Sequence, residues 1–118
     1  MSYGVRIKRL KVQGSNGITL EEWLAYVRLD REMRHIGEAV IQSPKGETIR
    51  YEAPGLTEWV DPQTGRKTLF DHQKISGTVS VGHPSREALV KMFKVAEALQ
   101  AVVQGDECEY YDASGNPT

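Results

Sequence analysis

Few side chains in this sequence could bind a metal ion, and their spacing does not bring them together. The histidines and the single cysteine are His35, His72, His83 and Cys108. No two of them follow the CxxC, HxH or HExxH spacings that direct two ligands to one zinc ion. The sequence therefore predicts no metal site, and the histidines are interpreted as residues of strand ends, turns and connections.

Catalytic groups are equally scattered. Cys108 is a potential nucleophile, but Glu107 and Glu109 flank it, and nearby negative charge suppresses the reactive thiolate. The acidic pairs Glu21-Glu22 and Asp106-Glu107 are typical of a solvated face rather than of a general acid and base. The phosphate-binding patterns GxGxxG and GxxxxGK[ST] are absent. We therefore expect a protein that is not an enzyme and that carries no cofactor.

Length and composition indicate one globular domain in a reducing compartment. The chain has 118 residues, of which 39% are hydrophobic and 26% charged, within the range of folded single domains. Its one cysteine cannot form an internal disulfide. The N-terminal residues lack the apolar stretch of a signal peptide, and no run is long enough to span a membrane. We expect a cytoplasmic protein without a membrane partner.

The first third of the chain predicts a strand followed by a helix. Apolar and polar residues alternate over 3–13, with a slip of one residue at Lys8-Arg9 that indicates a bulge. Thr19 precedes Glu22 by the spacing of a capping box, so a helix should begin there and end near Asp30. An apolar stripe with helical spacing comprises Leu20, Trp23, Leu24 and Val27, which makes Trp23 a core residue.

Residues 36–81 consist of short β-like runs separated by turns. The runs 39–41 and 48–51 flank Ser43-Pro44-Lys45-Gly46, a turn sequence, and are predicted to pair as a hairpin. Further strands are predicted within 56–60, 68–70 and 75–81. An antiparallel meander is the simplest arrangement of these runs.

The last third predicts a second helix and a closing strand. Ser85 is a good N-cap, and a wide apolar stripe follows it, with Lys91, Lys94 and Glu97 outside the stripe. Residues 101–104 can form a strand, and 113–118 are predicted to be a flexible C-terminal tail. The predicted fold is a single α+β domain over 1–112, in which two helices pack on an antiparallel sheet of about five to six strands. We write its order as β-α-β-β-β-β-α-β.

Three functional hypotheses follow from the sequence: a protein-binding inhibitor, a nucleic-acid-binding or regulatory module, and a small enzyme or ligand binder whose pocket is assembled by distant residues. A basic row near the N-terminus supports the second. Arg6, Lys8, Arg9 and Lys11 follow one another along the polar side of the first predicted strand. They could serve a small nucleic-acid-binding or regulatory module, or they could protect the edge of an outer strand. Because the net charge is only −1, we do not expect nucleic acid to be the main partner.

The charge is unevenly distributed, and this supports the hypothesis of a protein-binding inhibitor. Residues 1–50 carry a net charge of +3 and residues 51–118 a net charge of −4. An acidic surface with aromatic side chains can attract and anchor a basic protein partner. The candidate partner-binding residues are Glu52, Glu58, Trp59, Asp61, Asp106, Glu107, Glu109 and Tyr110.

Several segments also resemble those of a family of small cytoplasmic proteobacterial proteins. They are 17–23, 70–71 with Ile75, Val79 and Val81, then 83–85, 91–92, Ala96 and, above all, Ala101-Val102-Val103-Gln104-Gly105-Asp106-Glu107. Some members resemble immunity proteins encoded beside toxins that are delivered by contact-dependent or type VI secretion. The resemblance implies a non-enzymatic inhibitor that binds a cognate toxin, such as a nuclease, by protein–protein contact. The sequence departs from the family pattern at Cys108 and at Gly82-His83.

Overall fold

A computed structural model describes residues 3–10 and 17–118, and the strand and helix elements follow the predicted order there. The elements are β1 (Gly4–Lys8), α1 (Leu20–Leu29), β2 (Met33–His35), β3 (Glu38–Gln42), β4 (Thr48–Glu52), β5 (Thr57–Val60), β6 (Lys67–Gln73), β7 (Thr78–Gly82), α2 (Arg86–Ala98) and β8 (Val102–Gly105). The part of the first predicted strand beyond Leu10, which includes Lys11, lies outside the described residues.

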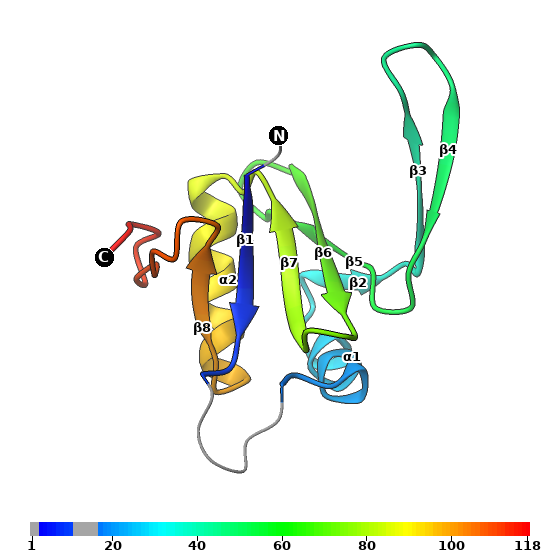
Figure 1. Cartoon of the computed structure of the whole chain (residues 1–118). Coiled ribbons are helices and arrows are strands. Elements are labelled where there is room, and N and C mark those ends of the chain that lie inside the picture. Colours follow the sequence, from blue (N-terminus) through cyan, green and yellow to red (C-terminus); the bar gives the residue numbers. More distant parts are fainter. Residues whose placement is uncertain (1–2, 11–16) are drawn as a thin grey trace.

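The main sheet has the strand order β2-β5-β6-β7-β1-β8, and each pair of neighbours is antiparallel. Val5 lies opposite Val81, and Ile7 lies opposite both Val79 and Val103, so their side chains share one face of the sheet. Both helices cover this face, and α2 lies behind β1 in Figure 1. The predicted α+β class, with two helices on an antiparallel sheet, is confirmed.

Helix α1 begins at the predicted capping box. The Glu22 backbone N–H donates to the Thr19 hydroxyl (3.1 Å), and the Thr19 N–H donates to the Glu22 carboxylate (3.2 Å). The same carboxylate accepts two hydrogen bonds from Arg9, at 2.6 and 3.0 Å. Trp23 is fully buried as predicted, with its ring stacked on that of Phe70 at a centroid distance of 6.2 Å. Its indole N–H donates to the Gly55 carbonyl oxygen (2.9 Å).

The Arg9–Glu22 pair makes a testable contribution to acid stability. Hydrogen bonds from Arg9 and from the Thr19 backbone lower the pKa of Glu22 to about 2. Because this value is below that of the unfolded chain, the contribution is complete above about pH 4.5 and is lost as the pH falls toward 2. The Glu22 side chain is 42% exposed, so solvent screening should limit the effect to less than about 1 kcal/mol.

Urea denaturation between pH 2 and pH 7 would measure this contribution. We expect Glu22→Gln to unfold at lower urea concentration than the wild type at pH 7 and to match it near pH 2. Glu21→Gln is the matched control, because Glu21 lies in the same helical turn and is exposed. An equal loss of stability in both variants at pH 7 would contradict the assignment to the Arg9 pair.

Strands β3 and β4 form a separate two-stranded sheet, as the hairpin prediction required. Val40 lies opposite Arg50, and the Ser43 N–H donates to the Glu47 carbonyl oxygen (2.8 Å) next to the turn. The hairpin projects from the main sheet (Figure 1). We call residues 38–52 the hairpin arm.

Three features of the structure differ from the sequence-based expectations. β2 was not predicted, since its three residues show no alternation and form a strand by pairing with β5. Lys91 is buried rather than outside the apolar stripe, because its long side chain reaches two acidic groups at the end of α1. The predicted tail folds back on the domain: the Thr118 N–H donates to the Tyr110 carbonyl oxygen (2.8 Å), and Arg86 donates to Asn116 (2.5 Å).

Within the described ranges, neither α1, with 10 residues, nor α2, with 13, has the length and apolar character needed to cross a bilayer.

Candidate functional site

The predicted partner-binding residues are distributed over separate parts of the molecule. Glu58 and Trp59 lie on β5, and Asp106 to Tyr110 follow β8. In the sheet, β5 and β8 are separated by β6, β7 and β1, which at about 4.8 Å per strand places them about 19 Å apart. Glu52 lies on the hairpin arm. These residues therefore do not form one acidic surface.

Trp59 and Asp61 are structural residues, which corrects their prediction as partner contacts. Trp59 is 4% exposed, and its indole N–H donates to the Glu32 carboxylate (2.9 Å). Asp61 is 5% exposed and accepts a hydrogen bond from the Gln63 N–H (2.9 Å) in the turn before β6. The sequence analysis placed Trp59 at the surface because a turn follows it. Its hydrogen-bond partner, Glu32, lies on a segment that is distant in the sequence.

Part of the acidic segment after β8 is also engaged within the domain. Asp106 accepts hydrogen bonds from the Gly4 N–H (2.7 Å) and from Arg6 (2.5 Å), and the Gly4 bond is the main cause of its lowered pKa. The Glu109 carboxylate accepts hydrogen bonds from the Tyr3 and Tyr111 hydroxyls. Glu107 and Tyr110 remain exposed. This segment closes the edge of the sheet and offers few free acidic groups.

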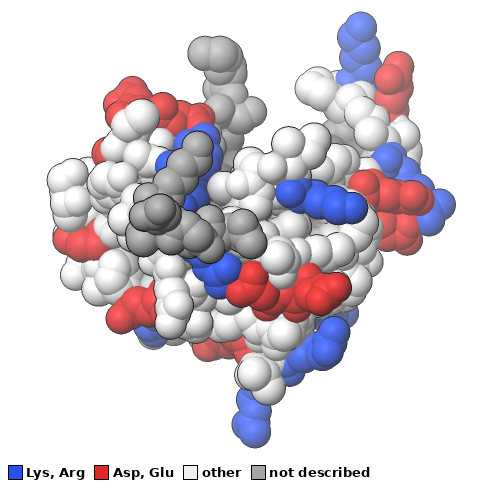
Figure 2. Space-filling view, turned by 60° about the horizontal axis from the view of Figure 1, so that its bottom comes forward, with Lys and Arg blue, Asp and Glu red and all other residues white. Residues whose placement is uncertain are grey.

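Two residues of the predicted basic row are likewise engaged within the domain, each in a separate ion pair. Arg6 forms an ion pair with Asp106 and Arg9 forms one with Glu22. Figure 2 shows acidic and basic side chains interspersed over the end of the molecule at the bottom of Figure 1. Among the described residues on this view, the charges do not form a continuous basic surface of the kind that tracks a phosphate backbone.

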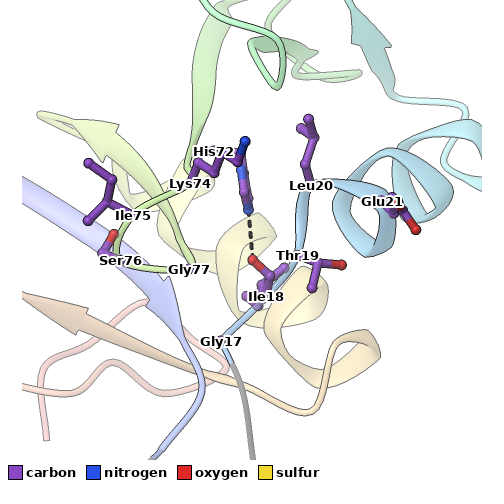
Figure 3. A pocket seen from close by; sticks show the side chains of 10 residues that line it. All are labelled: Gly17, Ile18, Thr19, Leu20, Glu21, His72, Lys74, Ile75, Ser76 and Gly77. Carbon is purple, nitrogen blue, oxygen red and sulfur yellow. Dashed lines mark hydrogen bonds between the residues drawn. The ribbon is translucent and has the colours of Figure 1, made fainter.

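A cavity of about 600 Å³ lies between the start of α1 and the β6–β7 turn (Figure 3). His72, on its wall, is 7% exposed, and its Nε2 lies 2.7 Å from the Ile18 carbonyl oxygen. Because a carbonyl oxygen only accepts, Nε2 must carry the proton. Ile75 and Ser76 lie on the turn, well apart from the imidazole ring in Figure 3. The histidine therefore fastens the start of α1 to β6.

Among the described residues, no three His, Cys, Asp or Glu side chains gather as the ligands of a metal ion would. The Nε2 atom of His35 lies 2.6 Å from the Pro54 carbonyl oxygen. Within residues 3–10 and 17–118, His35 forms no hydrogen bond with an acidic side chain. Cys108 is exposed in the turn after β8, with a left-handed backbone (φ 65°). The arrangement of these groups suggests no particular chemistry.

A polar cluster that the sequence did not predict surrounds the buried Lys91. The Lys91 Nζ lies 2.6 Å from Asp30 and 3.1 Å from Glu32, and the Tyr26 hydroxyl donates to Asp30 (2.5 Å). Burial raises the pKa of Asp30, but hydrogen bonds from Lys91 and Tyr26 outweigh it and leave the pKa lowered. Glu32 also has a lowered pKa, chiefly because Trp59 donates to it. The cluster joins α2 to α1 and β5, and its groups are paired, as in a structural network.

Among the described residues, three exposed large apolar side chains lie on the hairpin arm. Val40 is 67% exposed, Ile49 50% and Tyr51 41%. Since side chains alternate along a strand, Ile49 and Tyr51 share one face of the arm, while Val40 and Arg50 lie on the other. We call the side with Ala39, Ile49 and Tyr51 the arm face.

Polar contacts fix the arm face beside the uncovered side of the main sheet. The Tyr51 hydroxyl donates to Asp71 of β6 (2.5 Å), and this hydrogen bond raises the pKa of Tyr51. Of the predicted contact residues, Glu58 lies on the uncovered side of β5, where it pairs with Arg34 (3.2 Å). Glu52 lies on the other side of the arm, where it pairs with Arg50 (3.1 Å). The sequence signal for the arm was its pair of β-branched and aromatic runs around a turn.

Comparisons of the chain with protein-family models, with curated protein sequences and with solved structures found no match.

Proposed function

We propose that this chain is a non-enzymatic protein-binding domain that contacts its partner through the arm face. The observation that carries the proposal is the exposure of Ile49 and Tyr51 on a two-stranded hairpin that projects from the body. A two-stranded hairpin is marginally stable by itself, and large apolar side chains gain about 1.5–3 kcal/mol when they are buried. A partner that covers the arm face would supply this free energy.

In its specific form, the proposal makes the chain an immunity protein that neutralises a cognate bacterial toxin in the cytoplasm. This form rests on the sequence resemblance described above. Glu58 lies on the same uncovered side of the main sheet as Asp71 and would favour a partner with a basic surface, because complementary charges accelerate association. Inhibition would require only that the bound domain cover the active site of the toxin or hold it in an inactive shape.

Co-expression with the product of the adjacent gene would test the proposal. We expect the wild-type chain to restore growth if that product is toxic, and to be captured with it. Ile49→Asp should weaken the capture at least about tenfold, because it places a charge in the apolar contact. The matched control is Ile75→Asp, a fully exposed isoleucine on the β6–β7 turn. Equal binding by the wild type and Ile49→Asp would contradict the role of the arm face.

A further inference from the structure

The sheet edges of this molecule are protected unequally. The edge of β8 is covered by the returning chain: Gln104 pairs with Tyr110, and the Tyr111 N–H donates to the Val103 carbonyl oxygen (3.0 Å). β2 has only three residues, two of which are Arg34 and His35. Short strands, charged side chains and covering segments are the usual ways in which a protein prevents strands from pairing with another chain.

The two outer edges of the hairpin arm also differ in how well they are protected against pairing with another chain. β4 has Arg50 at its centre, paired with Glu38 and Glu52. β3 has Val40 at its centre, 67% exposed, and contains neither proline nor a basic residue. In the part of the chain that the structure describes, the edge of β3 is therefore the least protected.

The hydrogen bonds of the arm determine which backbone groups face this edge. Ser43 N–H donates to Glu47 (2.8 Å), and Ala53 N–H donates to Gly37 (3.0 Å). Hydrogen-bonded pairs alternate along an antiparallel ladder, so residues 39 and 41 also direct their N–H and C=O groups toward β4. The N–H and C=O groups of Glu38, Val40 and Gln42 consequently point away from β4.

We propose that two copies of this chain associate by antiparallel pairing of their β3 edges, about a two-fold axis at Val40. In this register Val40 lies opposite Val40 of the second copy, and Glu38 lies opposite its Gln42, so every outward N–H and C=O group finds a partner. No like charges face each other. The same operation on β4 would place two Arg50 side chains opposite each other, which is unfavourable.

The base of the arm provides space for the second copy. The register places Ser43 of the second copy opposite Gly37, where a cavity of about 590 Å³ is lined by Ile36, Gly37, Glu38, Glu52, Ala53 and Pro54. The hairpin tips would thus lie beside the bases of their counterparts. A contact built on strands of five residues is smaller than a standard interface, so we expect a dissociation constant in roughly the micromolar range.

Edge pairing leaves the arm face open, so the dimer goes beyond the proposed function and does not depend on it. Ile49→Asp should weaken capture of the toxin at least about tenfold without affecting the dimer. A change at Val40 should affect the dimer without abolishing capture, because its side chain lies on the opposite side of the arm. The two proposals therefore fail independently.

Cysteine cross-linking tests the register directly, in the full chain with Cys108→Ser. In an antiparallel hydrogen-bonded pair the Cα atoms lie about 5.5 Å apart, which suits a disulfide. Val40→Cys should therefore form a covalent dimer under mild oxidation. Gln42→Cys is the matched control, because its counterpart in the second copy lies about 14 Å away along the strand. Both positions are exposed, so both variants should fold.

We expect Val40→Cys to cross-link at least about tenfold faster than Gln42→Cys, and sedimentation velocity should show a concentration-dependent dimer of the wild type that Val40→Lys prevents. Similar cross-linking rates at both positions would reveal random collision and overturn the register. A wild type that stays monomeric over about a hundredfold range of concentration would overturn the dimer. If the wild type stays monomeric, the β3 edge could still pair with an extended segment of another protein, but not with a second copy of this chain.

Discussion

Replacing Lys91 with methionine should lower the free energy of unfolding by about 3 kcal/mol, because it leaves a buried carboxylate without its counter-ion. The side chains of Lys91 and Asp30 are only 10% and 11% exposed, and their charged atoms lie 2.6 Å apart. Methionine retains most of the apolar stem of lysine, so the loss reports the missing charge rather than a cavity. Chemical denaturation followed by tryptophan fluorescence would measure it.

A control variant and the pH dependence of Lys91→Met test whether the unpaired charge of Asp30 causes the loss of stability. Lys94→Met, a change at an exposed position of the same helix, should alter stability by less than about 0.5 kcal/mol. Adding Asp30→Asn to Lys91→Met should recover part of the loss, since the unpaired charge is then absent. Without Lys91, burial becomes the dominant influence and should raise the pKa of Asp30, so acidification should reduce the penalty. A penalty that did not change with pH would contradict this explanation.

Replacing Gly77 with alanine should destabilise the domain by about 3 kcal/mol, because two independent costs add at this position. Its backbone is left-handed (φ 66°), a conformation that costs a residue with a Cβ about 1–2 kcal/mol. An added Cβ would also lie 2.8 Å from the Cα of Gly17, whose segment leads into α1. Backbone atoms cannot rotate away, so the N–H of Ile18 should lose its short bond to Gly77 (2.8 Å).

Gly65→Ala separates the two costs. Gly65 has a similar backbone angle (φ 74°), but no atom lies within 4 Å of an added Cβ. This variant should lose only the conformational part, about 1 kcal/mol. Thermal or urea unfolding of both variants would give the difference. If the two variants lost equal stability, the close approach of Gly17 and Gly77 would have no energetic importance.

Local signals in the sequence predicted the elements whose causes are local. The spacing of Thr19 and Glu22 specifies the start of α1, and the turn at 43–46 specifies the arm, since each involves residues only a few positions apart. The polar cluster was not predictable in this way, because Lys91 and Asp30 are 61 positions apart. The same reason explains why Trp59, whose partner Glu32 is 27 positions away, was assigned to the surface.

The candidate contact surface was also predicted only where it depends on residues close together in the sequence. Charge counting indicated an acidic second half, but it could not show that Gly4 and Arg6 bind Asp106, since these groups are about 100 positions apart. The runs 39–41 and 48–51 did indicate a hairpin. The pattern gave neither its apolar face nor the exposure of that face beside the main sheet. The contact surface therefore had to be redrawn around the arm.

Amide hydrogen exchange on the wild-type chain, alone and mixed with the product of the adjacent gene, tests the central claim most directly. Exchange slows where a partner covers a strand and completes its hydrogen bonds. We predict slower exchange in peptides that span residues 38–52 when the partner is present, with little change in 106–112. Slower exchange at 106–112 with an unchanged arm, or the absence of any complex, would contradict the account.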